Sequence, residues 1–313
     1  VSLTLKTKKK NTAFFYGASF GVAHHFCSLY WISISFEFAN AGGYFTGLIA
    51  VLFLSVFFSF FTATAFYFIS KLKYNDESRI FFNAIAIILI LTSMDWIKGN
   101  IFWSFPWLPI SAIWTFSTLT LFPFSLLGKW GYSLVTFSLI IALLLANKNP
   151  KYSFILLCPF FLILSLFYLS QMPNISNPKK INIRLVQPNI SQSEKWKPEK
   201  AKENFQKLIN LSIKKGYQET DLIIWPETSL NFDLKSEEEN FIVFKNFIKQ
   251  SNNVIAGAIR KEYVNNKLNI YNSLYLFNGK NGEIQKHDKV KLVPFGEFIP
   301  FKNFFNLNKL TQG

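Results

Sequence analysis

Hydrophobic positions follow two different patterns in the two parts of the chain. Up to about Gln171 they form long apolar runs that are separated by short polar segments. Beyond Lys179 they alternate with charged residues in shorter strand-like and helix-like segments. The sequence therefore predicts a helical domain over 1–171, a turn-rich linker over 172–180 and an α/β domain over 181–313.

The apolar runs predict about five membrane-spanning helices. Each run is close to or above the ~20 residues that a helix needs to cross ~30 Å of hydrocarbon. Buried helices of a soluble core are the alternative, but runs with hardly any internal charge favour the membrane. The predicted spans are Thr12–Ile34, Gly43–Ser70, Ile80–Ile97, Phe124–Ala146 and Ser153–Gln171.

Lysine placement predicts how these spans are oriented. Basic residues collect before the first span, after the second and after the fourth. The loop between the first and second spans, Phe36–Gly42, has none, and the loop between the third and fourth spans is only flanked by Lys98 and Lys129. Because basic loops stay on the cytoplasmic side, the N-terminus is expected there. An odd number of spans then carries the chain from Met172 onward to the opposite side, which is the periplasm in a bacterium. The basic loops contain Lys6, Lys8, Lys9, Lys10, Lys71, Lys73, Arg79, Lys148 and Lys151.

The second part predicts strands that alternate with helices and then follow one another directly. Helical spacing appears over Pro198–Lys215 and Ser236–Gln250. The expected strands are Ile181–Gln187, Asp221–Trp225, Asn253–Arg260 and Ile270–Phe277, with a hairpin turn over Asn278–Gly282. This order is typical of a layered α/β domain.

Composition excludes several classes of function. The formal net charge is +15, but the lysines are spread along the chain without interleaved aromatic stacking motifs, so nucleic acid is not an expected partner. The two cysteines, Cys27 and Cys158, both lie in apolar stretches, which argues against a disulfide framework or a metal cluster. No nucleotide-binding glycine loop is present, and no cofactor is expected.

Two polar features stand out in the α/β part. Glu227 follows an apolar strand at a turn fixed by Pro226, a position from which a rigid sheet can aim a general base into a cleft. A lone Glu there is also explained by a solvated turn. Lys289 and Lys291 would share one face of a strand, which a solvated edge explains, but the apolar residues that follow would let a lysine stabilise an oxyanion.

An aromatic loop connects the third and fourth predicted spans. It carries Trp103 and Trp107 close to Asp95 and Lys98. Tryptophan suits the headgroup region, where one side of the indole is wet, so an ordinary aromatic belt explains most of these residues. The functional alternative is a loop that guides a lipid into a site above the membrane.

These motifs together resemble a known family. Trp225-Pro226-Glu227, combined with the segment Lys289–Glu297, closely resembles the apolipoprotein N-acyltransferases, membrane-bound members of the nitrilase or carbon-nitrogen hydrolase superfamily. The resemblance runs in the correct order over almost all 313 residues. At Asp95 and Lys98 the family more often has Glu and Arg, which preserves the charges. Further matches lie at Val186–Ile190, Gln192–Trp196, Phe105–Leu108 and Gly17–Trp31.

The resemblance implies a fold and a reaction. The fold is a multi-span α-helical membrane domain followed by an α-β-β-α sandwich. In the reaction, a cysteine thiol takes an acyl chain from a phospholipid such as phosphatidylethanolamine and passes it to the α-amine of a diacylglyceryl-modified apolipoprotein. Glu227 matches the general base, Lys289 the oxyanion-stabilising residue and Glu297 a second carboxylate, while Trp196 and Trp107 match substrate-binding aromatic residues. The implied location is the bacterial inner membrane with the sandwich in the periplasm.

The nucleophile of the family has no counterpart in this sequence. It would lie on a strand some tens of residues beyond the position that matches Gly313, and Cys27 and Cys158 lie within predicted spans. The expectation is therefore a C-terminally truncated chain with an incomplete sandwich, apolar sheet surface left uncovered and no acyl transfer of its own.

Two other functions remain open at this point. One is a nitrilase-like amidase acting on a small carbon–nitrogen substrate, although such an enzyme has no need of five spans. The other is a non-enzymatic polytopic carrier or scaffold. Carriers normally place ionisable groups in mid-span, and here only His24 and His25 form a conspicuous pair.

Overall fold

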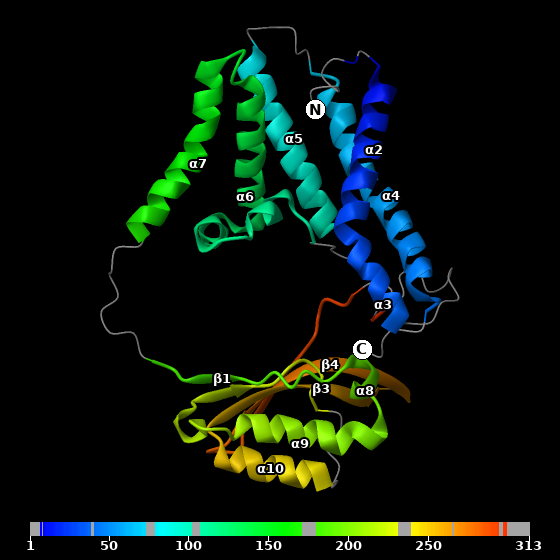
Figure 1. The fold of residues 1–313 in the computed structure, drawn as a ribbon, viewed down its shortest axis with the longest axis vertical. Helices are drawn as coiled ribbons and strands as arrows, with labels where there is room; N and C mark the ends of the chain where they lie inside the picture. Colours follow the sequence, from blue (N-terminus) through cyan, green and yellow to red (C-terminus); the bar gives the residue numbers. More distant parts are fainter. Residues whose placement is uncertain are drawn as a thin grey trace. The chain divides into compact units, whose positions relative to one another are not determined.

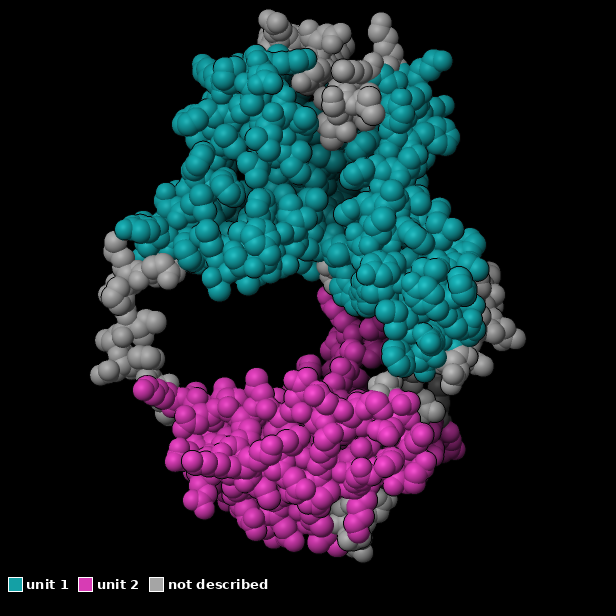
Figure 2. Space-filling model, in the orientation of Figure 1, with its two compact units in different colours: residues 1–175 teal, residues 176–313 magenta. Residues whose placement is uncertain are grey.

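The computed structural model describes residues 7, 9–38, 41–72, 79–101, 107–170, 180–230, 239–264, 266–293 and 297–298. The chain forms two compact units, Val1–Ile175 and Ser176–Gly313, which are coloured separately in Figure 2. Except for Lys180, the predicted linker over 172–180 lies outside the described residues. The same is true of Trp103, Phe105 and Pro106 in the aromatic loop.

The first unit is helical (Figure 1). Among the described residues, four helices are long and apolar enough to cross a membrane: α4, α5, α6 and α7 up to Leu169. The predicted span Thr12–Ile34 is divided among α2, a 3₁₀ turn and α3, and it is not one of these four. The helices are α2 (Lys10–Leu29), η1 (Tyr30–Ile32), α3 (Ser33–Phe38), α4 (Gly43–Ile69), α5 (Ile80–Asn100), η3 (Ile110–Trp114), α6 (Thr118–Leu145) and α7 (Pro150–Ser170).

Glycines bring α2 unusually close to α4. A Cβ atom at Gly17 would lie 2.7 Å from the Cα atom of Ala63, and one at Gly21 would lie 2.8 Å from the Cα atom of Ser59. No side chain fits at either position, so the glycine pair at a spacing of four residues lets the two backbones meet, as in membrane helix pairs that pack through small residues.

The second unit contains a five-stranded sheet in the order β1-β2-β3-β4-β5. The first two pairings are parallel and the last two are antiparallel. The strands are β1 (Ile183–Leu185), β2 (Leu222–Ile224), β3 (Asn253–Val264), β4 (Lys267–Asn278) and β5 (Ile284–Asp288), and the helices are α8 (Gln192–Lys195), η4 (Pro198–Lys200), α9 (Ala201–Ser212), η5 (Tyr217–Glu219) and α10 (Glu239–Gln250). The observed strands and helices confirm the expected layered α/β organisation, although β3 and β4 are longer than the sequence predicted.

One face of this sheet holds the hydrophobic core of the unit. Alternate residues of β3, such as Val254 and Ala256, are completely buried against aromatic side chains, including Phe205 of α9 and Phe244 of α10. Both helices lie along the same side of the sheet in Figure 1. Leu185 and Leu274, which point to the opposite face, are 75% and 48% exposed. Among the described residues, these apolar side chains on the opposite face are therefore largely exposed.

Candidate active site

Glu227 lies at the turn that follows the carboxyl end of β2. The preceding Trp225 is buried in the core, where its backbone N–H donates to the carbonyl of Ile255 at 2.8 Å and its Nε1 donates to Ser212 Oγ at 2.8 Å. Thr228, the next residue, has a φ of 50°, a left-handed conformation that is uncommon outside glycine. A buried anchor and a sharp turn thus project Glu227 away from the core.

Gly257 of β3 makes room for this turn. A Cβ atom at that position would lie 2.5 Å from the backbone nitrogen of Thr228 and 2.8 Å from the Cα atom of Glu227. The carbonyl of Gly257 accepts the N–H of Leu230 at 2.9 Å, which fastens the far end of the turn to the same residue. Because only glycine allows this approach, Gly257 fixes the height of Glu227 above the sheet.

The Glu227 carboxylate meets two donors at one oxygen. Asn272 Nδ2 and Lys289 Nζ both donate to Glu227 Oε1, the latter at 3.3 Å. The same lysine donates to Glu297 Oε1 at 2.6 Å, and Glu297 Oε2 accepts the backbone N–H of Val293 at 2.8 Å. The Glu227 side chain is 64% exposed, whereas that of Glu297 is only 11% exposed. One ammonium therefore joins an accessible carboxylate to a buried one.

These contacts set the charge of the pair. Partial burial alone would raise the pKa of Glu227, but the hydrogen bond from Asn272 and the charge of Lys289 outweigh it and lower that pKa. Burial alone would lower the pKa of Lys289, but the hydrogen bond to Glu297 and the charge of Glu227 raise it. At neutral pH the site therefore presents a free carboxylate base beside a protonated amine.

Lys289 is held through its own backbone as well. Its N–H donates to the carbonyl of Asn272 at 2.8 Å. The preceding Asp288 accepts hydrogen bonds from Ser273 Oγ at 2.6 Å and Arg260 at 2.8 Å, and these two donors lower its pKa, with Arg260 the larger influence. β5 ends at Asp288, so the premise that Lys289 and Lys291 share one face of a strand is wrong: both follow the strand.

Asn272 and Lys195 are two contacts of Glu227 that the sequence did not reveal. Asn272 holds the Glu227 carboxylate with its side chain and Lys289 with its carbonyl. Lys195 Nζ donates to the backbone carbonyl of Glu227 at 3.1 Å and to Thr228 Oγ1. Burial lowers the pKa of Lys195, and the negative charge of Glu227 partly offsets this effect. The only feature of the sequence that could have pointed to Asn272 is a side-chain amide within a largely apolar strand. That this amide contacts Glu227 depends on the register of the strands.

Both units of the chain match sequence profiles of known proteins. The profile of the N-terminal domain of apolipoprotein N-acyltransferase matches residues 1–142, and that of carbon-nitrogen hydrolase matches residues 182–307. The apolipoprotein N-acyltransferase of Rickettsia typhi is 30% identical over 98% of this chain and 62% of its own length. That of Rickettsia prowazekii is 28% identical over the same shares, and that of Brucella suis is 29% identical over 91% of this chain and 55% of its own length.

The chain belongs to the apolipoprotein N-acyltransferase family. The family assignment from Trp225-Pro226-Glu227 and Lys289–Glu297 is therefore confirmed, as is a membrane helical domain joined to a nitrilase-like domain. The chain spans 62% of the length of the two Rickettsia relatives. These relatives are named as acyltransferases, which is the enzyme class expected from the sequence.

The two aromatic residues assigned to substrate by the family resemblance lie in different units. Trp196 directly follows α8 and is exposed, and the ammonium of its neighbour Lys195 lies 5.5 Å from its ring centroid. Lys195 thereby connects Trp196 to the Glu227 turn. Trp107 belongs to the helical unit, where its ring centroid lies 5.1 Å from that of Trp31.

Both cysteines of the chain belong to the first unit, whereas Glu227 belongs to the second. Cys27 is on α2 and Cys158 is on α7, and both are exposed on helices of the first unit. Over the described residues, no group of three or more His, Cys, Asp or Glu side chains is arranged to hold a metal ion.

Proposed function

We propose that the full-length protein transfers an acyl chain from a phospholipid to the N-terminal α-amine of a diacylglyceryl-cysteine apolipoprotein through a cysteine thioester. The relatives of this family are named for N-acylation of apolipoproteins. The observation that carries the proposal is the set of contacts that joins Glu227, Lys289 and Glu297, because it provides an ionised base next to a fixed cation.

Glu227 serves as the general base in this proposal. Asn272 and Lys289 both contact Oε1, so Oε2 is the oxygen that accepts the thiol proton. The thiolate then forms a bond to the ester carbonyl carbon of the phospholipid. When the carbon–oxygen bond of the ester breaks, the proton passes from Glu227 to the departing glycerol oxygen, leaving a thioester.

The second half of the reaction reuses the same groups. The α-amine of the apolipoprotein attacks the thioester carbon, its proton is taken up by Glu227, and the carbon–sulfur bond breaks to return the thiol. Lys289 stabilises the oxyanion that forms on the carbonyl oxygen in each half. Glu297 holds the Lys289 ammonium in place from its buried side.

The nucleophile, the substrates and the location belong to the same proposal. The 313 residues contain no thiol in the second unit, so we do not expect them to form a thioester alone. Trp196 and Trp107 bind the lipid substrates, the acyl donor being phosphatidylethanolamine-like. In this proposal the helices lie in the inner membrane, with the N-terminus in the cytoplasm and the second unit in the periplasm, which the distribution of basic residues among the loops supports.

Reconstituted full-length protein tests this reaction directly. We expect mass spectrometry of a synthetic diacylglyceryl-cysteine peptide to show one added acyl chain on its α-amine when phosphatidylethanolamine vesicles are present. Hydrolysis of small amides without any acylated peptide would instead support an amidase. Absence of both products from a folded protein would contradict the proposal.

A further inference from the structure

Thr228, which directly follows Glu227, has a backbone conformation that its side chain disfavours. Its φ is 50°, in the left-handed region where a branched Cβ crowds the backbone. Such a conformation costs free energy, persists only where surrounding contacts hold it, and is found most often at functional sites. The contacts of Thr228 therefore bear on how Glu227 is presented.

The chain is fastened where it leaves this turn. Ser229 Oγ donates to the carbonyl of Gly257 at 3.2 Å, and the N–H of Leu230 donates to the same carbonyl at 2.9 Å. Both contacts come after Thr228 in the sequence. They fix the far end of the turn, but neither falls on the peptide group that joins Glu227 to Thr228.

The ammonium of Lys195 holds that peptide group. Lys195 Nζ donates to the carbonyl oxygen of Glu227 at 3.1 Å and to Thr228 Oγ1. The carbonyl oxygen lies in the plane of the peptide, whereas Oγ1 is carried by the Cβ atom beyond the N–Cα bond. An ammonium that bridges the two oxygens therefore constrains the rotation about this bond, which is φ of Thr228, together with the side-chain rotamer.

Lys195 is itself held in place within the second unit. Its backbone N–H donates to the carbonyl of Ser191 at 3.0 Å, and the carbonyl of the preceding Glu194 accepts Nδ2 of Asn204, a residue of α9, at 3.3 Å. Burial lowers the pKa of Lys195, and the charge of Glu227 partly offsets this. The ammonium is thus partly removed from water, where a hydrogen bond from a charged donor is strengthened.

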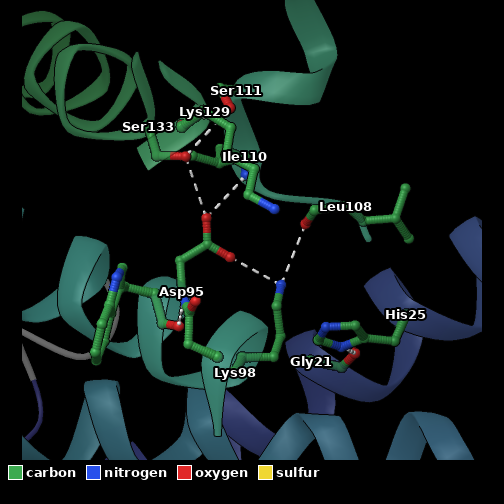
Figure 3. Close-up of polar contacts among 11 residues, drawn as sticks. Gly21, His25, Asp95, Lys98, Leu108, Ile110, Ser111, Lys129 and Ser133 are labelled. Carbon is green, nitrogen blue, oxygen red and sulfur yellow. Dashed lines mark hydrogen bonds and ion pairs between the residues drawn. The ribbon is translucent and has the colours of Figure 1, made fainter. Parts of the chain in front are cut away.

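The helical unit holds a left-handed residue with the same kind of group. Among the described residues, four that are not glycine have a positive φ, and two of these are asparagines, which adopt it readily. The other two are Thr228 and Leu108, whose φ is 55°. Lys98 Nζ donates to the carbonyl of Leu108 at 3.2 Å (Figure 3). In each unit, a lysine ammonium therefore contacts the strained residue.

We propose that Lys195 is a positioning residue for the general base: it holds Thr228 in the left-handed conformation that directs the Glu227 carboxylate to its two donors. These donors are Asn272 Nδ2 and Lys289 Nζ. The catalytic consequence rests on the proposed function, in which Glu227 takes up the proton. The conformational role does not depend on it.

Four variants separate this role from a general effect of charge. Lys195→Met removes the ammonium and keeps most of the apolar stem, whereas Lys195→Arg keeps the charge and the donors. Lys197→Met is the matched control, because this lysine is exposed, lies two residues away and carries the same charge. Thr228→Gly removes the strain, since glycine adopts a positive φ readily.

Crystal structures of the full-length variants test the conformational role without any activity. We expect Thr228 to leave the left-handed region in Lys195→Met and to remain in it in Lys195→Arg and Lys197→Met. An unchanged φ in Lys195→Met would overturn the role. If Lys195→Met does not fold, Thr228→Val decides, because it keeps the branched Cβ and removes the acceptor oxygen. Residue 228 should then leave the left-handed region, and a retained conformation would again overturn the role.

The rate of thioester formation with phosphatidylethanolamine vesicles tests the consequence for the base. We expect Lys195→Met to lower the rate at saturating phospholipid about tenfold, because the base is misplaced, while the half-saturating concentration stays within about twofold. Lys195→Arg should stay within about threefold and Lys197→Met within about twofold of the wild-type rate. In Thr228→Gly protein, Lys195→Met should cost no more than about threefold, since glycine needs no support.

The kinetic outcomes distinguish the alternatives. A loss that persists undiminished in Thr228→Gly protein would overturn the role, because Lys195 would then act through its charge and not through Thr228. A loss confined to the half-saturating concentration would also overturn it and would mean that Lys195 serves substrate binding beside Trp196. A folded wild-type protein that forms no thioester would instead refute the proposed function, and the crystal structures would still decide the conformational role.

Discussion

Each unit contains a carboxylate–ammonium cluster, and the two clusters differ in how far their carboxylates are exposed to solvent. In the helical unit, Asp95 and Lys98 are 8% exposed and direct their hydrogen bonds at backbone groups. In the α/β unit, Glu227 is 64% exposed and receives both of its side-chain donors on one oxygen. A carboxylate with an oxygen left open to solvent can accept a proton during a reaction, whereas an enclosed one whose oxygens are occupied holds structure in place.

The comparison also shows how each cluster is supported. Lys289 has a buried carboxylate, Glu297, on one side and an accessible one on the other, so its position is maintained while Glu227 stays available. Lys98 pairs with Asp95 of the same helix and donates a hydrogen bond to the backbone carbonyl of Leu108. The first arrangement suits chemistry and the second suits positioning.

The largest effect is expected from removing the ammonium of the α/β unit. Lys289→Met should lower the rate of acyl transfer by the full-length protein by about 10²–10³-fold, because the oxyanion loses its charged donor. Steady-state kinetics with phosphatidylethanolamine measure this loss. Lys291→Met is the matched control, since this exposed lysine lies two residues away and should retain at least about half of the activity. Equal losses in both variants would mean that general positive charge, and not Lys289, is required.

A smaller effect is expected at the base of the Glu227 turn. Gly257→Ala forces a Cβ atom against the backbone of Thr228, so the turn must move. We expect a decrease of about 1–3 kcal/mol in the free energy of unfolding of the full-length protein, as for other overpacked sites. Denaturant unfolding followed by tryptophan fluorescence measures it. Ala258→Gly is the matched control, because the side chain of Ala258 points into the core and its removal should leave the Glu227 turn in place. An unchanged free energy of unfolding in Gly257→Ala would contradict the close approach of the turn to this position.

The smallest effect is a shift in the pH dependence of acyl transfer. Asn272 lowers the pKa of Glu227, so Asn272→Leu should raise that pKa and move the acid limb of the pH–rate profile to higher pH. The sign follows because the base is active when ionised, and a raised pKa protonates it earlier as pH falls. The profile of kcat/KM between about pH 3 and about pH 7 covers this limb, because a carboxylate whose pKa is lowered loses its charge below the ~4.3 of a free Glu. An unchanged acid limb would mean that Glu227 is not the titrating base.

Local motifs predicted the groups of the α/β site, but not their surroundings. Glu227, Lys289 and Glu297 stand in recognisable segments next to Pro226 and Val293, and the structure brings all three into contact. Asn272 could not be predicted as their partner, because the contact depends on the register in which Ile259 faces Asn272 across β3 and β4. Register is set by the whole sheet and not by a single segment.

The helical unit shows the same limit. Hydropathy located four helices that can cross a membrane, since length and apolar composition are local properties. The predicted span Phe124–Ala146 begins later than α6, because Ser117 and Thr120 form a capping box that starts the helix at Thr118. Gly128, with a φ of 62°, interrupts the helix within that span. The link from Lys98 to Leu108 depends on a left-handed residue in a loop, and no sequence pattern indicates which leucine adopts that conformation.

The most direct test of the central claim is intact-protein mass spectrometry of the full-length protein after exposure to phosphatidylethanolamine without an apolipoprotein acceptor. The account predicts one acyl chain bound as a hydroxylamine-sensitive thioester in the wild-type protein and in the surface control Glu199→Gln, and none in Glu227→Gln, because an amide cannot take the thiol proton. A thioester that forms equally fast in folded Glu227→Gln protein would contradict the assignment of Glu227 as the base.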